Sequence, residues 1–330
     1  MNPSTNTKKI ESQQKVSFKV RGASMPLDPV IQEIIKSLPP NDFETLTPEE
    51  FRIGNGDYSE GGGEDVDEIE DINLSTANGQ DMAIRIYRPE GVEAESPVVI
   101  FFHGGGWVVG NINSHDGQCR GLANSSGLTV IAVDYRKAPE HPFPAPPEDC
   151  YAAVCQIVER SEEFRIDSER LAVAGDSAGA NLATVVCQMS RDRNGPEIKH
   201  QMLFYGCFDI DPDRWPSHTE NGEGYILDRE MIRWFYRNYV GSEKFVDDSY
   251  ASPIRAQDLS GLPPAQVITA EFDPLRDEGE AYAEALSKAG VETYYECVPS
   301  LPHAFLVFFE MVPAAREVMV AACKRLASAL

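Results

Sequence analysis

The sequence predicts an α/β fold in which a mostly parallel sheet carries helices on both faces. Short apolar runs such as 97–102 (PVVIFF) recur along the chain. Unbroken runs of this length are typical of strands that are buried on both faces. Helical patterns separate the runs, and such an alternation is typical of a parallel sheet between two layers of helices.

The predicted elements follow one another in a regular order. Strands are expected at 97–102, 128–133, 171–174, 202–205, 265–269 and 291–298, and helices at about 115–125, 146–160, 178–191 and 275–289. An earlier helix is expected to begin after Asp28, because aspartate caps helix N-termini and Pro29 suits the first helical position. Sites in such sheets form at the carboxyl ends of the strands, so the residues just after these runs are the functional candidates.

Residues 208–248 interrupt the alternation. They are rich in aromatic side chains, and a helix is expected from Asp228 to Tyr239. We expect this insertion to pack with the N-terminal helix and form a small helical cap; an ordinary surface helix between strands is the alternative. The expected division of the chain has four parts. Residues 1–24 form a flexible N-terminal extension, and residues 25–60 form an N-terminal cap segment. Residues 208–248 form an inserted cap segment, and the catalytic domain consists of residues 61–207 and 249–330.

Composition and charge limit the binding partners and the cellular compartment that we expect for the protein. Of the 330 residues, 53 are acidic and 29 are Lys or Arg, which gives a formal net charge of −24. Nucleic acids and anionic membranes bind cationic surfaces, so we expect neither as a partner. The polar start of the chain has no apolar stretch of the signal-peptide type. The seven cysteines form no C-x-x-C pair and fit a reducing compartment, so we expect a soluble, cytoplasmic protein.

The pattern G-D-S-A-G at 175–179 predicts that Ser177 is a nucleophile. It follows a predicted strand and precedes a predicted helix, which is the context that a G-x-S-x-G elbow requires. Such a sharp turn crowds the residues around the serine, and glycine two positions to either side removes side chains that would clash. The pattern alone is weak, and its position between strand and helix supports the prediction.

A serine hydroxyl needs a neighbouring base, and three histidines follow the serine along the chain: His200, His218 and His303. His200 starts a predicted strand, which is the wrong end for a site, and His218 lies in the predicted insertion. His303 follows the last predicted strand and is the predicted base.

The acid of a triad with this elbow lies between the serine and the histidine in the sequence. It should follow the strand at 265–269, where Asp273 lies in a turn before Pro274. Its task is to orient the imidazole and to stabilise the imidazolium. Asp273 is the predicted acid, and Glu271 is the alternative.

A glycine loop, 103–107 (HGGGW), follows the first predicted strand. Backbone N–H groups that point at a developing oxyanion stabilise it, and glycine lets the backbone approach closely. We predict that the amides of Gly104 and Gly105, with that of Ala178 beside the nucleophile, form an oxyanion hole. His103 is expected to organise this loop.

Taken together, these motifs resemble the bacterial hormone-sensitive lipase-like family of α/β-hydrolase carboxylesterases, in particular members with aspartate before the serine. Three further stretches carry the resemblance, which spans about 25–330: 25–29 (MPLDP), 135–145 (YRKAPEHPFPA) and 273–279 (DPLRDEG). The resemblance implies an α/β-hydrolase fold with a mobile cap and hydrolysis of short- to medium-chain carboxylic esters through a serine acyl-enzyme. It also implies no metal or cofactor and, in many members, a homodimer.

The substrate range stays open at this stage. Glu271-Phe272 stand where the family often has a small residue before the acid, and Ala180 replaces a frequent glycine after the elbow. Trp107 and Tyr205 are predicted to line the substrate pocket. A peptidase or amidase with the same triad remains an alternative, because the triad alone does not distinguish amides from esters.

Two other classes of protein fit less well. A dinucleotide-binding dehydrogenase is suggested by residues 97–136, but the G-x-G-x-x-G pattern fails because its third glycine would fall at Val109. A non-catalytic receptor on the same fold would be expected to lack a triad member, and all three are present.

Overall fold

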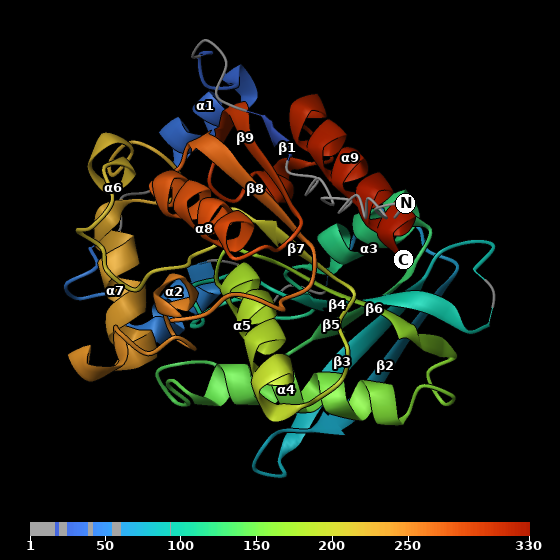
Figure 1. Cartoon of the computed structure of the whole chain (residues 1–330). Coiled ribbons are helices and arrows are strands. Elements are labelled where there is room, and N and C mark those ends of the chain that lie inside the picture. The colour runs from blue at the N-terminus through green and yellow to red at the C-terminus, as the bar shows by residue number, and fades with distance from the viewer. Residues whose placement is uncertain (1–16, 20–24, 39–41, 55–60, 93) are drawn as a thin grey trace, which may run out of the picture.

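The computed structural model describes residues 17–19, 25–38, 42–54, 61–92 and 94–330. Within these residues, nine strands form one sheet in the order β1-β9-β8-β7-β6-β4-β5-β3-β2 (Figure 1). The strands are β1 (Ser17–Lys19), β2 (Glu68–Ser75), β3 (Asp81–Arg88), β4 (Ser96–Phe102), β5 (Thr129–Val133), β6 (Ile166–Asp176), β7 (His200–Phe204), β8 (Ala265–Phe272) and β9 (Thr293–Pro302). The α-helices are α1 (Pro29–Ser37), α2 (Pro48–Gly54), α3 (Asp116–Ser126), α4 (Ala145–Glu159), α5 (Ala178–Arg193), α6 (Ser217–Glu220), α7 (Arg229–Val240), α8 (Arg276–Lys288) and α9 (Pro313–Ala329).

The sheet is parallel except at one end. β3 pairs antiparallel with both β2 and β5, and the other neighbouring strands pair parallel. All six strands predicted from apolar runs are present. The β2–β3 hairpin and the C-terminal helix α9 were not predicted.

Helices cover both faces of the sheet, as predicted. Figure 1 shows α4, α5 and α8 on one face, and α3 and α9 on the other. Side chains of β4 alternate between two buried clusters, with Ile100 and Phe102 in the cluster under the first set of helices and Val99 and Phe101 in the cluster under the second. Burial on both faces is why the whole run is apolar, and the predicted fold class is confirmed.

The N-terminal region differs in part from the prediction. Ser17–Lys19, which fall within the expected flexible extension, form β1 and pair parallel with β9, with Ser17 opposite Tyr294. The rest of that extension lies outside the described residues. Asp28 caps α1 as predicted, since its carboxylate accepts a 2.9 Å hydrogen bond from the Val30 amide.

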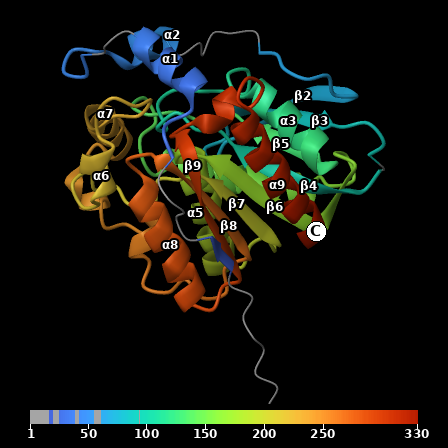
Figure 2. The same ribbon diagram turned by 90° about the horizontal axis from the view of Figure 1, so that it is seen from above.

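The two predicted cap segments pack against each other through aromatic side chains. The Phe51 ring of α2 lies 5.2 Å from the Trp234 ring of α7 and 5.8 Å from that of Phe235. The Trp234 indole donates a 3.1 Å hydrogen bond to the carbonyl of Leu46. The packing partner is therefore α2 and the loop before it, whereas Ile31 of α1 joins the cluster beneath α3 and α9. Figure 2 shows α1 and α2 at the same end of the molecule as α6 and α7.

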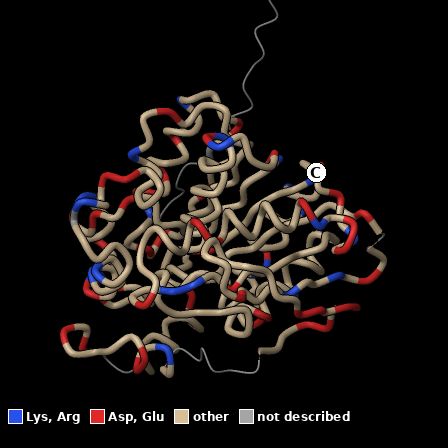
Figure 3. Tube along the Cα trace, turned by 90° about the horizontal axis from the view of Figure 1, so that it is seen from below, with Lys and Arg blue, Asp and Glu red and all other residues tan. Residues whose placement is uncertain are grey.

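Charged residues lie mainly on the outside of the molecule. In Figure 3, acidic residues recur along the loops and helices on all sides of the view, with Lys and Arg interspersed among them. No helix within the described ranges combines the length and the apolarity needed to cross a membrane.

Candidate active site

Ser177 stands at a tight turn between β6 and α5. Its backbone has φ 54° and ψ −119°, which is a strained conformation for a residue with a side chain, and such strain clusters at functional sites. The turn presses against the end of β4, because a Cβ atom on Gly179 would lie only 1.9 Å from the carbonyl oxygen of Phe102. The amide of Ser177 donates a 2.9 Å hydrogen bond to the carbonyl of Phe204 in β7. The structure therefore has the sharp turn that was predicted at Ser177.

The structure brings the three predicted triad residues together. Nε2 of His303 lies 2.9 Å from Oγ of Ser177, and Nδ1 of the same ring lies 2.9 Å from Oδ2 of Asp273. Asp273 is completely buried and His303 is 5% exposed, while Ser177 is half-buried. A neutral imidazole with its hydrogen on Nδ1 donates to the carboxylate and accepts from the hydroxyl. This arrangement can take a proton from the serine.

The segment around Asp273, called the acid loop below, shows which carboxylate faces the histidine, Asp273 or the alternative Glu271. Oδ1 of Asp273 accepts a 2.8 Å hydrogen bond from the amide of Leu275, so one oxygen is held by the loop and the other faces His303. The carboxylate of Glu271 instead accepts a 3.3 Å hydrogen bond from the amide of Ser300. Asp273 is therefore the carboxylate in contact with the histidine.

The predicted oxyanion role of Gly104 is wrong. Its amide donates a 2.9 Å hydrogen bond to Oδ1 of Asp176, so it is not available to an oxyanion. A Cβ atom on Gly104 would lie 2.5 Å from Oδ2 of the same carboxylate, which is why the position must be glycine. Over the described part of the chain, the amides of Gly105, Gly106 and Ala178 have no hydrogen-bond acceptor. These three remain as donors beside Ser177.

Asp176 is a buried carboxylate that joins the glycine loop to the elbow. Nε2 of His115 lies 3.6 Å from its Oδ1, and the hydroxyl of Tyr205 lies 3.5 Å from its Oδ2. Burial alone would raise the pKa of Asp176, but His115 and the amide of Gly104 outweigh burial and lower the pKa below its ordinary value. The carboxylate therefore stays ionised and keeps its hold on the loop.

His103 lies beneath the same loop. Its Nδ1 lies 2.7 Å from the carbonyl oxygen of Gly104. Its ring stacks on that of Tyr135 at 4.3 Å, and the Tyr135 hydroxyl donates a 2.8 Å hydrogen bond to the carbonyl of His103. Burial lowers the pKa of His103. These contacts suit a residue that shapes the loop.

The predicted pocket residues are core residues. Trp107 is 1% exposed and stacks on Tyr239 with ring centroids 4.0 Å apart, and Tyr205 is completely buried with its ring 5.0 Å from that of His303. Both side chains are packed among neighbouring rings, so the prediction that they line the pocket is wrong. A hollow of about 630 Å³ lies between α1 and residues 223–225, and Phe272 lines it.

Two polar side chains beside the triad, those of Asp176 and Asn221, have no role in the sequence-based prediction of the site. The motif identifies Asp176 only as the mark of a subgroup of the family, although its place directly before the nucleophile is a usable signal. Asn221 donates hydrogen bonds of 3.1 Å to the carbonyls of Glu271 and Asp273. It lies 52 residues before the acid, so no local pattern reveals it. Among the described residues, no group of three or more His, Cys, Asp and Glu side chains could hold a metal ion.

Known proteins with a similar sequence or structure agree with this fold. A family model described as alpha/beta hydrolase fold matches residues 99–307. Carboxylesterase NlhH of Mycobacterium tuberculosis is 42% identical over 252 residues, which are 76% of this chain and 79% of that protein. Ethyl acetate hydrolase of Pseudomonas putida is 36% identical over 263 residues, which are 79% of this chain and 82% of that protein. The hyperthermophilic esterase of Pyrobaculum calidifontis has a TM-score of 0.85 at 38% identity, over 92% of this chain and 99% of that one. The chain therefore belongs to the α/β-hydrolase fold family, in its hormone-sensitive lipase-like branch of carboxylesterases.

Proposed function

We propose that this carboxylesterase hydrolyses short- to medium-chain esters through an acyl-enzyme formed on Ser177. The observation that carries the proposal is the pair of 2.9 Å contacts that links the serine to His303 and the histidine to Asp273. A hydroxyl is activated as a nucleophile when a base accepts its proton and an acid orients that base. The strained turn at the serine adds to this argument.

The proposed reaction has two steps. His303 takes the hydroxyl proton as Oγ of Ser177 attacks the ester carbonyl, and it then gives that proton to the departing alcohol. A water molecule that His303 deprotonates attacks the acyl-enzyme, and the acid leaves with the serine restored. The negative oxygen of each tetrahedral intermediate would be held by the amides of Gly105, Gly106 and Ala178. One such donor is typically worth about 3–4 kcal/mol in the transition state.

The proposed preference for shorter chains rests on two observations. A relative that is 36% identical is named for the hydrolysis of ethyl acetate, an ester with a two-carbon acyl group. Two members of the triad are also enclosed, since Asp273 is completely buried and His303 is only 5% exposed. Amide hydrolysis by the same triad stays the competing proposal, and comparison of matched anilides and esters would decide between them.

We also propose that the protein is cytoplasmic and forms a homodimer. The first proposal is supported by its cysteines, because all seven are free thiols and disulfides are rare in a reducing compartment. The second rests on the family resemblance alone. Light scattering on the purified protein would give its mass in solution.

The experiment that tests the function is hydrolysis of p-nitrophenyl esters from acetate to palmitate by the native protein and by Ser177→Ala. Activity that peaks at short acyl chains and disappears in the variant supports the proposal. A native protein that hydrolyses only anilides, or only palmitate, would overturn the proposed substrate class.

A further inference from the structure

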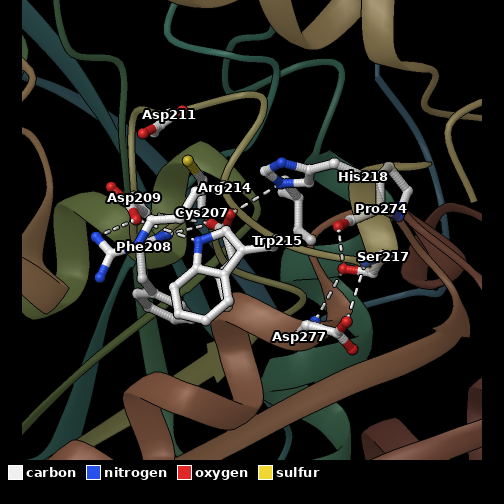
Figure 4. A network of polar contacts seen from close by, with 12 residues as sticks. Cys207, Phe208, Asp209, Asp211, Arg214, Trp215, Ser217, His218, Pro274 and Asp277 are labelled. Carbon is white, nitrogen blue, oxygen red and sulfur yellow. Dashed lines mark hydrogen bonds and ion pairs between the residues drawn. The ribbon is translucent and has the colours of Figure 1, made fainter. Parts of the chain in front are cut away.

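The inserted segment makes many of its polar contacts with the loop that carries Asp273. Ser217, His218 and Asn221 belong to α6 and the residue after it, and they are only 0%, 1% and 6% exposed. Figure 4 shows Ser217 beside Pro274 and Asp277, which follow the acid. We propose that Ser217 and Asn221 form an acid clamp, a pair of positioning residues that hold Asp273 in the orientation needed for catalysis. This inference rests on the proposed function.

Asn221 holds the backbone on both sides of Phe272. An amide group carries two N–H bonds, and Nδ2 of Asn221 lies 3.1 Å from the carbonyl oxygens of both Glu271 and Asp273. The register between β8 and β9 shifts between Ala270 and Phe272, so regular strand pairing is interrupted here. Asn221 thus supplies hydrogen bonds where the strand leaves its ladder, and it fixes the peptide groups from which the Asp273 side chain projects.

Ser217 holds the other end of the acid loop. Its hydroxyl donates a 2.6 Å hydrogen bond to the carbonyl of Pro274 and accepts one of 3.1 Å from the amide of Asp277. The carboxylate of Asp277 in turn accepts a 3.0 Å hydrogen bond from the amide of Ser217. The first turn of α8 has no side-chain cap from Leu275, its N-cap residue. Ser217 therefore caps α8 from a different element and fixes the loop against it.

A buried contact between a histidine and a glutamate fixes α6 itself. Nε2 of His218 lies 3.1 Å from Oε2 of Glu278, and both side chains are at most 1% exposed. Oε1 of Glu278 accepts a 2.6 Å hydrogen bond from the amide of Phe208, just after β7. Removing one member of a buried pair leaves the other uncompensated, which is costly. This part of the insertion is therefore tied to the catalytic domain.

The contacts of the clamp converge on the acid. They reach the carbonyls of Glu271, Asp273 and Pro274, which are the acid and residues within two positions of it. The carboxylate of Asp273 can meet His303 only if this backbone holds its direction. Catalysis is sensitive at this scale, since a displacement of about 1 Å can cost about 10²-fold in rate.

The test compares Asn221→Ala with the matched control Asn238→Ala. Asn238 lies in α7 of the same insertion and donates a 2.9 Å hydrogen bond to the carbonyl of Trp234, away from the acid loop. We expect Asn221→Ala to lower kcat on a p-nitrophenyl ester by about 10- to 100-fold, with KM unchanged. The rate at which a fluorophosphonate modifies Ser177 should fall by a similar factor. Asn238→Ala should match the native protein in all three measurements.

A second pair of variants separates positioning from folding. Ser217→Ala should lower kcat, whereas Ser217→Thr, which keeps the hydroxyl, should restore most of it. Thermal unfolding of each variant shows whether it is folded at the assay temperature. The proposal is overturned if Asn221→Ala behaves as Asn238→Ala does, or if it raises KM while kcat is unchanged. Failure of the proposed function is a different result, namely a Ser177→Ala protein that keeps the native activity.

Discussion

The amide of Gly104 donates a 2.9 Å hydrogen bond to the buried carboxylate of Asp176, the residue directly before the nucleophile. This bond joins the glycine loop that follows β4 to the elbow that follows β6. The donors proposed for the oxyanion, the amides of Gly105, Gly106 and Ala178, therefore belong to one unit with Ser177. Preorganised donors of this kind need no rearrangement when charge develops in the transition state.

Asp176→Ala should lower kcat by about 10²-fold or more, as loss of one oxyanion donor does, because the glycine loop loses its anchor. KM should change little. Asp176→Asn keeps an oxygen that can accept from Gly104 and should be the milder variant. Steady-state kinetics on one short ester measures both, and an Asp176→Ala enzyme with the native kcat would contradict the anchoring role.

Asp273→Asn should lower kcat by about 10⁴-fold, as expected when the acid that orients a catalytic histidine is lost. Glu271→Gln should be nearly neutral, since the carboxylate of Glu271 contacts the amide of Ser300 and not the histidine. Both variants are measured on the same ester. The reverse pattern would move the acid role to Glu271.

Because His200 is buried, we expect the free energy of unfolding to fall in acid. Its burial, with a smaller contribution from Arg325, lowers its pKa to about 4. The amide of Gln266 lies 3.1 Å from Nε2 of His200, and this contact is a hydrogen bond only while the imidazole is neutral. Below the ordinary pKa of about 6.5 the unfolded chain binds a proton that the folded protein does not. The stabilisation that the neutral His200 side chain contributes is therefore complete above pH 6.5 and is lost as the pH falls towards 4.

Urea unfolding at pH 7.5 and 4.5 measures this effect. Between these values the native protein should lose about 2–3 kcal/mol more of its free energy of unfolding than His200→Gln does. Equal losses in the two proteins would show that His200 does not titrate as its burial implies.

Phe51→Ala should lower the free energy of unfolding by about 3–5 kcal/mol, the usual cost of deleting a buried phenylalanine. Phe51 is 6% exposed and its ring contacts those of Phe43, Trp234 and Phe235. Ile53→Ala is the matched control in α2, because Ile53 is 62% exposed, and it should change stability by less than about 0.5 kcal/mol. Similar losses in the two variants would mean that the contact between the cap segments contributes little.

The elements predicted from sequence are those with the strongest local signal. β4 and β5 are buried along almost their whole length, and β6 and β8 each carry a buried apolar stretch, so these strands are easy to find. β3 carries only the alternating signal of Met82, Ile84 and Ile86, and β2, its partner, is largely exposed. β1 has three residues, and its partners in β9 lie at the far end of the sequence, so nothing local predicts it.

The sequence was enough to predict which residues form the triad and in what order they follow one another. Ser177, Asp273 and His303 follow from one motif and from the order of strands. Neither the motif nor the order of strands shows where a backbone N–H group points. The predicted role of Gly104 was wrong because the acceptor of its N–H group, Asp176, lies 72 residues away in the sequence. Trp107 failed as a pocket residue because its stacking on Tyr239 depends on where the insertion folds.

The central claim is that Ser177 is the nucleophile, and a fluorophosphonate tests it most directly. The native protein would be treated with this reagent until ester hydrolysis stops, and the modified residue would be located by mass spectrometry of its peptides, with Ser177→Ala treated in parallel. We predict one modification per chain, on Ser177, in step with the loss of activity, and none in the variant. Modification of another residue as activity is lost, or full activity after Ser177 is modified, would contradict the account.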